Sequence, residues 1–220
     1  MTDVDIYWIS GSPPAWRVLL ALEYKQIRYQ SHVLSAADKE HKTAEFLELN
    51  PRGQVPVIKH GDLVVRESFA ILHYLNQIAP EPDLFGKTAE QGALVWQWLL
   101  DYEGNLRTSL AQVARIVFRK QIAEKAAELD RAIDAIKPEL ESLESTLQNN
   151  GMLMGDSLSA ADITLYPDLQ WLKRALGEAG VYGECSVLLS HIEKSQAFTK
   201  WEVAIQSVNN YEKTTPPHWR

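Results

Sequence analysis

Residues 50–68 combine a proline inside an apolar run with an acidic residue and a serine at the start of a predicted helix. Pro56 follows Val55 in that run and removes a donor that a central strand needs. If the bond between them is cis, the N–H and C=O of Val55 are free to pair with an extended ligand. The helix start at Ser68 favours a bound carboxylate, and Glu67 favours an ammonium group. Together they suit an α-amino-acid head group, although a helix cap beside a surface acid explains the same two residues.

The hydroxyl of Ser12 is a second candidate group. It stands between an apolar run typical of a strand and a helical pattern, and Pro13 suits the first helical position. A hydroxyl there can donate to a thiolate while the helix end adds positive potential. Lowering a thiol pKa by about two units requires about 2.7 kcal/mol, the scale of one charge-assisted hydrogen bond plus the dipole. The motif alone favours a plain helix cap, and only the predicted fold favours the chemical role.

Strand and helix patterns alternate through the first third of the chain and bring both candidate groups to the ends of elements. Two strands flank the helix that Ser12 opens, which predicts a βαβ unit with a parallel strand pair. A short polar helix, an antiparallel hairpin and an apolar-faced helix follow. In order, the predicted elements cover residues 4–9, 13–25, 27–33, 38–49, 55–66 and 68–78. The order βαβ-α-ββα is the thioredoxin-like arrangement.

A polar run with Pro80 and Pro82 ends this pattern and indicates a linker. Beyond it, apolar residues recur at helical spacing without a strand signal, so the predicted fold class is α/β plus all-α. The predicted domains are residues 1–79 (thioredoxin-like, ligand-binding), 80–88 (linker) and 89–220 (a helical bundle). We expect the polar tail, residues 210–220, to be irregular.

The helical part carries clear start and stop signals. We expect one long helix over residues 90–119 and another that ends at Gly151, with a kink or break at Pro138. Ser159 and Asp162 stand three apart as a capping box, which predicts a firmly started helix and no chemistry.

Composition excludes several classes of function. The formal net charge of −7 argues against nucleic acid or an anionic membrane as a partner. One cysteine, Cys185, excludes an internal disulfide framework, and no Cys/His spacing resembles a metal site. The turn at residues 12–15 holds no thiol, so disulfide exchange by the protein's own sulfur is excluded. With no secretory signal and no apolar run of membrane-spanning length, we expect a cytoplasmic protein.

Gln54-Val55-Pro56 and Glu67-Ser68, joined by one hairpin, resemble the glutathione site of the cytosolic glutathione transferases. Residues 155–164, Gly-Asp-Ser-Leu-Ser-Ala-Ala-Asp-Ile-Thr, are similar to a segment in the helical half of that family. The resemblance therefore covers both halves of the chain.

The residues around Ser12 resemble the serine-type classes of that family. Ser12 with Trp16-Arg17-Val18 resembles the zeta class, which includes maleylacetoacetate isomerase. Residues 11–18, taken with 40–42, 50–54 and 59–62, look more like the rho class. Theta and delta enzymes share the serine. The chain departs from the zeta isomerase pattern at residues 14–15, Pro-Ala, where that pattern includes a cysteine.

The resemblance implies a detoxifying transferase with glutathione as co-substrate, no metal, and Ser12 as the catalytic group. The glutathione-binding residues that it implies are His41, Lys42, Gln54, Val55, Pro56, Glu67 and Ser68. We expect the second-substrate pocket at Tyr102, Leu106 and Leu110, beside the first-strand turn, although ordinary helix–helix packing explains these residues better. In the expected homodimer, Asp101 is either a surface acid or a partner of the neighbouring subunit's glutathione.

Three functions fit these residues. The leading one is attack of a Ser12-stabilised glutathione thiolate on small electrophiles, and reduction of organic hydroperoxides is consistent with the same thiolate. The second is glutathione-dependent isomerisation of a maleylacetoacetate-type diketo acid. The third is a binding module that keeps the fold without the chemistry, as in translation elongation factor subunits and bacterial stress regulators. Retention of Ser12, Glu67 and Ser68 favours an enzyme.

Overall fold

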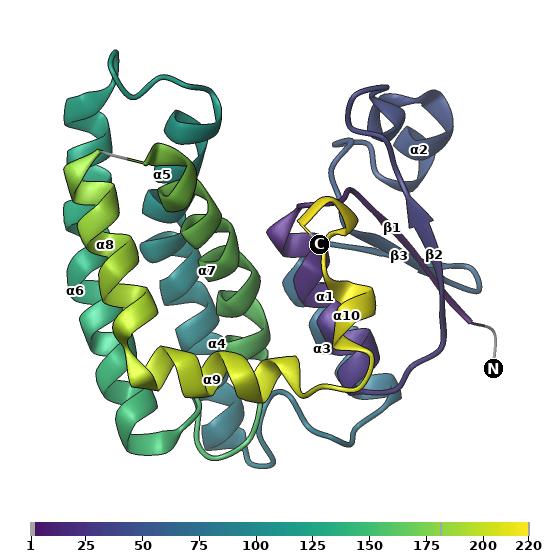
Figure 1. Ribbon diagram of the computed structural model, residues 1–220. Helices are drawn as coiled ribbons and strands as arrows, with labels where there is room; N and C mark the ends of the chain where they lie inside the picture. The colour runs from purple at the N-terminus through teal and green to yellow at the C-terminus, as the bar shows by residue number, and fades with distance from the viewer. Residues whose placement is uncertain (1–2, 181, 220) are drawn as a thin grey trace. The chain divides into compact units, whose positions relative to one another are not determined.

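A computed structural model of the chain describes residues 3–180 and 182–219, which form two compact units. One unit runs as far as Leu84 and takes up the chain again from Gln206, and the other is Phe85–Ile205. The first holds a four-stranded sheet and the second is entirely helical (Figure 1).

The sheet has the strand order β2-β1-β3-β4, with β1 (Val4–Trp8), β2 (Tyr29–Val33), β3 (Val57–His60) and β4 (Leu63–Arg66). β1 pairs in parallel with β2 and antiparallel with β3, so that Ile6 lies opposite Ser31 on one side and Ile58 on the other. Alternate residues of β1 are buried, as its apolar pattern predicts. The predicted thioredoxin-like arrangement is confirmed.

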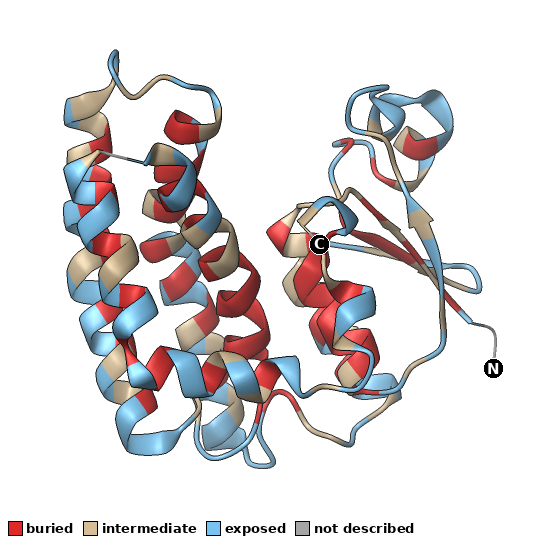
Figure 2. Ribbon diagram, in the orientation of Figure 1, coloured by how far each residue is buried: buried red, intermediate tan, exposed pale blue. Residues whose placement is uncertain are grey.

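Four helical segments accompany the sheet: α1 (Pro13–Tyr24), η1 (Glu40–Lys42), α2 (Ala44–Leu49) and α3 (Ser68–Ile78). α1 packs against α3 and is buried over most of its length (Figure 2). At its end, Lys25 donates to the carbonyl oxygens of Ala79 (2.7 Å) and Pro82 (2.6 Å), which fixes the chain leaving α3. Burial lowers the pKa of Lys25 to about 8.

The C-terminal segment forms α10 (Tyr211–Thr214) and a 3-10 turn, η2 (Pro217–Trp219), and both belong to the first unit. This differs from the sequence-based division, which grouped these residues with the helical domain at 89–220 and expected an irregular tail. Thr214 is fully buried against α1, and its hydroxyl accepts a hydrogen bond from Trp16 Nε1 (2.9 Å). The sequence gives no signal for this contact because its partners lie 198 positions apart.

The second unit contains α4 (Ala89–Gly104), α5 (Leu106–Phe118), α6 (Ala126–Asn150), α7 (Ala160–Ala179), α8 (Gly183–Lys194) and all but the last residue of α9 (Gln196–Gln206). The single helix predicted over residues 90–119 is two helices that meet at Asn105, whose side chain donates to the carbonyl oxygen of Asp101 (2.9 Å). α6 runs through Pro138 without a break. Pro138 and Asp134 are exposed, so water can satisfy the carbonyl that the proline leaves unpaired.

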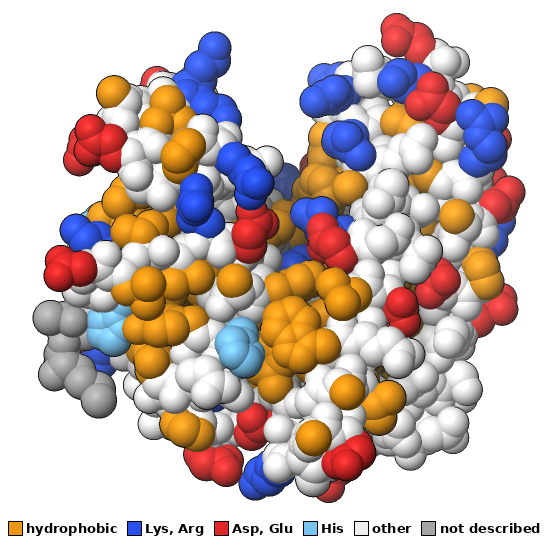
Figure 3. All heavy atoms as spheres, turned by 180° about the vertical axis from the view of Figure 1, so that it is seen from behind, with side chains coloured by type: hydrophobic (Ala, Val, Ile, Leu, Met, Phe, Trp, Pro, Cys, Tyr) orange, Lys and Arg blue, Asp and Glu red, His pale blue; other side chains and the backbone are white. Residues whose placement is uncertain are grey.

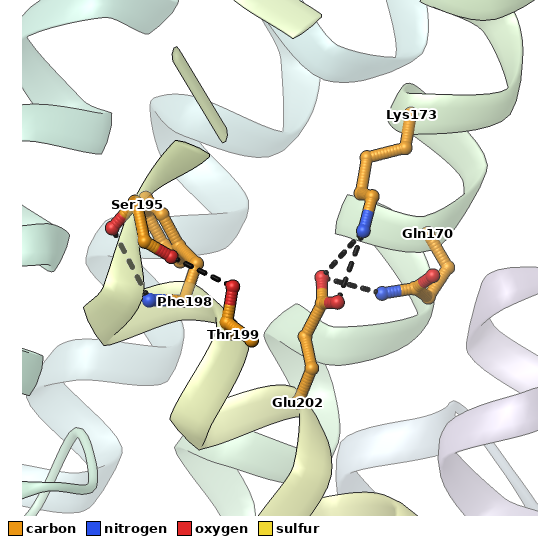
Figure 4. Close-up of polar contacts among 6 residues, drawn as sticks. All are labelled: Gln170, Lys173, Ser195, Phe198, Thr199 and Glu202. Carbon is orange, nitrogen blue, oxygen red and sulfur yellow. Dashed lines mark hydrogen bonds and ion pairs between the residues drawn. The ribbon is translucent and has the colours of Figure 1, made fainter. Parts of the chain in front are cut away.

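α7 begins with the predicted capping box and is largely buried (Figure 2). The Asp162 carboxylate accepts from the Ser159 N–H and hydroxyl, and also from Trp201 Nε1 (2.8 Å) on α9. A second link joins the same helices, because Glu202 accepts from Lys173 (2.9 Å) and Gln170 (2.8 Å) (Figure 4). Among the described helices, none has the length and apolar character needed to cross a membrane.

Candidate active site

Ser12 is the N-cap residue of α1, with φ −83° and ψ 112°. Its carbonyl oxygen accepts from the N–H groups of Ala15 (3.0 Å) and Trp16 (2.9 Å), which starts the helix. The hydroxyl makes no capping bond and has no other hydrogen-bond partner among residues 3–180 and 182–219. A half-buried hydroxyl at a helix N-terminus is therefore free to meet a ligand.

Two polar side chains near this turn, those of Trp8 and Ser10, are hydrogen-bonded elsewhere, and the Tyr7 ring is stacked. Trp8 Nε1 donates to the Ser31 hydroxyl (2.8 Å), and the Ser10 hydroxyl bonds to a histidine of the C-terminal segment. Tyr7 stacks on His32, with ring centroids 4.5 Å apart. Burial, with the charges of two nearby carboxylates, raises the pKa of Tyr7, so its hydroxyl stays protonated near neutral pH.

The segment leading into β3 leaves one backbone pair free. The Val55–Pro56 peptide bond is cis, as predicted, and Pro56 precedes the strand instead of interrupting it. The N–H and C=O of Val55 form no hydrogen bond with any residue that the structure describes. The Asn50 side-chain amide donates to the Gln54 carbonyl oxygen (2.7 Å), which holds this segment in place.

η1 and this segment meet at Gly53, where the backbone has φ +56°. A Cβ there would lie 2.7 Å from the His41 carbonyl oxygen, so only glycine allows the approach. Lys42 Nζ donates to the carbonyl oxygens of Arg52 (3.1 Å) and Gly53 (2.7 Å) and therefore fixes the loop. His41 Nδ1 is buried without a hydrogen-bond partner among the described residues, so this ring edge can still accept or donate.

Glu67 and Ser68 stand together at the start of α3. Glu67 has φ 67° and ψ 117°, a backbone conformation that a residue with a side chain rarely adopts. Its carboxylate is 66% exposed and lies 3.0 Å from Arg52 Nη1. Ser68 is the first residue of the helix, where the N–H groups have no partners within it.

The sequence did not predict Arg17 as a site residue. It entered only as part of the Trp16-Arg17-Val18 motif that resembles the zeta class. Its side chain is 1% exposed, its Nη1 lies 3.3 Å from the Ser68 hydroxyl, and its guanidinium lies 5.0 Å from the Phe69 ring centroid. A buried cation beside Ser68 adds positive potential where a carboxylate would bind. An arginine inside the apolar run of α1 was the available signal.

The three residues expected in a second-substrate pocket do not share one environment. Tyr102 and Leu106 line a cavity of about 410 Å³ in the helical unit, together with Trp98, Asp101 and Asn105. Leu110 is fully buried and does not line it. In the part of the chain that the structure describes, no three His, Cys, Asp or Glu side chains are grouped to hold a metal ion.

Comparison with known proteins identifies relatives of both units. The family model for the N-terminal domain of glutathione S-transferases matches residues 11–78, and that for the C-terminal domain matches residues 106–201. Glutathione S-transferase A of Pleuronectes platessa is 35% identical over 188 residues, which cover 78% of this chain and 79% of that protein.

Solved structures give the same result for the fold. A glutathione S-transferase from the Antarctic clam Laternula elliptica superposes with a TM-score of 0.80 at 30% identity, covering 99% of this chain and 94% of that one. A glutathione transferase from Burkholderia graminis, with two glutathione molecules bound per subunit, gives a TM-score of 0.78 at 24% identity, covering 96% and 87%.

Proposed function

Because the chain belongs to the glutathione S-transferase family and takes glutathione as its co-substrate, we propose that Ser12 stabilises the glutathione thiolate. One observation supports this role above all: Ser12 carries an unpaired hydroxyl at the first helix, while Trp8 and Ser10 are bonded elsewhere. The proposal makes the chain a serine-type transferase, similar to the rho, zeta and theta classes.

The reaction follows from this hydroxyl. Glutathione loses its thiol proton to solvent, and the Ser12 O–H donates to the resulting thiolate at the positive end of α1. The sulfur then attacks an electrophilic carbon, a C–S bond forms, and the leaving group departs with the electron pair of the broken bond. The same thiolate can attack the O–O bond of an organic hydroperoxide, releasing the alcohol. The thiol of a second glutathione then attacks the sulfur of the sulfenic intermediate, the S–O bond breaks, and glutathione disulfide and water are released.

Four groups would bind the γ-glutamyl end and the peptide backbone of glutathione. The free N–H and C=O of Val55, beside cis Pro56, suit pairing with the cysteinyl residue, and the exposed Gln54 side chain can add a donor. Ser68 and the α3 N-terminus would bind the γ-glutamyl carboxylate, and Glu67 its ammonium group. The rare backbone conformation of Glu67 supports this role, because such outliers cluster at ligand-binding sites.

His41 and Lys42 would meet the glycyl carboxylate. The unpaired His41 Nδ1 is buried and can donate to that carboxylate when it carries the proton. Lys42 already donates to two carbonyl oxygens, so its part would be charge and loop position. Tyr102 and Leu106 are the proposed electrophile-side residues, with Leu110 behind them as packing.

The test of Ser12 is the thiolate absorbance of the glutathione complex against pH, in wild type, Ser12→Ala and Ser12→Thr. We expect alanine to raise the pKa of bound glutathione by about one unit or more and to lower kcat severalfold to about tenfold near pH 7. Threonine, which keeps the hydroxyl, should stay near wild type. Since the hydroxyl makes no capping bond, Ser12→Ala should change stability by less than about 0.5 kcal/mol. Superimposable titrations of alanine variant and wild type would reject Ser12.

The choice of substrate has a direct assay. We propose conjugation as the main reaction, because Pro14 and Ala15 stand where the isomerase pattern includes a cysteine. Turnover of a chloronitrobenzene should therefore exceed turnover of maleylacetoacetate. The reverse order would establish the isomerase, and failure to bind glutathione in calorimetry would leave a binding module.

A homodimer in the cytoplasm is the proposed state of the enzyme. Hydrophobic side chains are exposed in patches on the face drawn in Figure 3, between charges of both signs. On α4, Leu94 is 54% and Leu100 62% exposed, which suits burial against a second copy. Light scattering of wild type and Leu100→Glu tests this: wild type should have twice the monomer mass, and the variant should shift toward monomer.

A further inference from the structure

The C-terminal segment lies on the turn that carries Ser12. α10 runs alongside α1 (Figure 1), and beyond it the His218 ring lies 2.8 Å from the Ser10 hydroxyl through Nδ1. The same ring packs on Gly11, where a Cβ would come within 2.9 Å of His218 Cε1. Gly11 has φ +84°, so both its conformation and its space require glycine.

The segment is fixed to α1 by buried contacts. Thr214 accepts from Trp16 Nε1 and donates to the Tyr211 carbonyl oxygen (2.7 Å). The Trp219 ring meets the Trp16 ring edge-on, with centroids 5.3 Å apart. Trp16 is one helical turn beyond Ser12, whose carbonyl oxygen it bonds through its N–H (2.9 Å). The tail is therefore tied to the same turn of helix that begins at Ser12.

The hydrogen bonds of His218 fix its tautomer. Trp219 Nε1 lies 2.9 Å from His218 Nε2, and an indole N–H can only donate. His218 Nε2 is therefore the acceptor, so in the neutral ring the proton is on Nδ1 and is donated to the Ser10 hydroxyl. Ser10 is in turn two residues from Ser12, on the far side of Gly11.

We propose that His218 is a positioning residue for the thiol site, holding the Ser10–Gly11–Ser12 turn so that the Ser12 hydroxyl points at the glutathione sulfur. The inference rests on the proposed role of Ser12. Among the described residues, the turn is tied by the bond from Ser12 N–H to the Ile9 carbonyl oxygen (3.2 Å) and by the His218–Ser10 bond, so loss of the second should let the Ser12 hydroxyl move. The groups proposed to bind the two ends of glutathione lie on η1, the loop before β3 and α3, so its affinity should hardly change.

The experiment titrates the thiolate of bound glutathione in His218→Ala, His218→Asn, Ser10→Ala and the Ser10→Ala/His218→Ala double variant. Lys213→Ala, an exposed residue of the same segment, is the matched control. We expect His218→Ala to raise the thiol pKa by about half a unit and lower kcat near pH 7 about threefold, with glutathione Kd within about twofold. Asparagine, which keeps a donor near the Nδ1 position, should restore most of the effect. The double variant should resemble either single one, because both remove one interaction.

The outcomes separate the two proposals. If Ser12→Ala shifts the titration and folded His218→Ala does not, the role of His218 is overturned and that of Ser12 stands. If neither variant shifts it, both are overturned. If the Lys213→Ala control shifts as far as His218→Ala, the effect comes from general loosening of the tail, and the specific role of His218 is overturned.

Discussion

Replacing Asp162 with alanine should be among the most damaging single changes in the helical unit. The side chain is fully buried, and its carboxylate accepts four hydrogen bonds. Leu153 N–H (2.9 Å) and Trp201 Nε1 (2.8 Å) donate to Oδ1, and Ser159 donates to Oδ2 from its N–H (2.9 Å) and hydroxyl (2.6 Å). One residue thus connects the start of α7 to the loop before it and to α9.

The size of the effect follows from these donors. Alanine leaves three N–H groups buried without a partner, each costing about 1–3 kcal/mol, while the Ser159 hydroxyl can rotate to another acceptor. Water entering the space recovers part of this, so we expect a loss of about 3–5 kcal/mol in the free energy of unfolding. Asparagine keeps the acceptor for Leu153 and Trp201 but sets an N–H₂ group against Ser159. It should cost about 1–2 kcal/mol.

Urea unfolding of the whole chain measures this, followed by tryptophan fluorescence and by far-ultraviolet circular dichroism. Asp156→Ala, which removes an exposed carboxylate from the loop before α7, is the control and should be neutral. An Asp162→Ala variant within about 1 kcal/mol of wild type would refute the reasoning. So would an asparagine variant as unstable as the alanine one, because the difference between them isolates the Oδ1 bonds.

Three further predictions concern other parts of the chain. Glu67→Ala should weaken glutathione binding by about 1.5–3 kcal/mol in calorimetry. Arg52→Ala, which removes only the exposed ion-pair partner of Glu67, should change the binding free energy by less than about 1 kcal/mol. Equal effects of the two variants would assign the loss to the ion pair and not to a contact of Glu67 with glutathione. The pKa of Lys25 in the folded protein, about 8, lies below its value in the unfolded chain, so the unfolded chain binds more protons between about pH 8 and 10. The free energy of unfolding should therefore rise over this range by about 1–3 kcal/mol relative to Lys25→Met. Parallel pH profiles of the two proteins in urea unfolding would contradict this. Glu202→Ala should cost about 1–2 kcal/mol of stability, and a double-mutant cycle with Lys173→Ala should give a coupling free energy of at least about 0.5 kcal/mol. If the effects of the two substitutions simply add, the ion pair contributes no coupling and the prediction is wrong.

The sequence alone determined the elements that depend on short-range patterns. The βαβ order and the hairpin follow from period-two apolar runs and turn residues, and they are present as β1 to β4. The capping box at Ser159 and Asp162 was equally readable, because its donor and acceptor stand within one turn of helix. The position of Ser12 at the first helix belongs to the same class of local signal.

The tertiary structure alone decided whether Ser12 caps its own helix or keeps its hydroxyl free. A Ser-Pro motif is compatible with both, and in the folded turn the Ser12 side chain forms no capping bond. Likewise, the burial of Arg17 beside Ser68 depends on how α1 packs on α3, which no local pattern encodes.

The C-terminal segment is the clearest case of structure that depends on long-range contacts. Polarity and two consecutive prolines predict an irregular end, yet Thr214 is buried under Trp16 and His218 bonds Ser10, across 198 and 208 positions of the chain. Local sequence patterns report propensities within a few residues, whereas these contacts exist because folding brings the two ends of the chain together. The residues that hold the Ser12 turn therefore come from a segment whose own sequence predicts no structure.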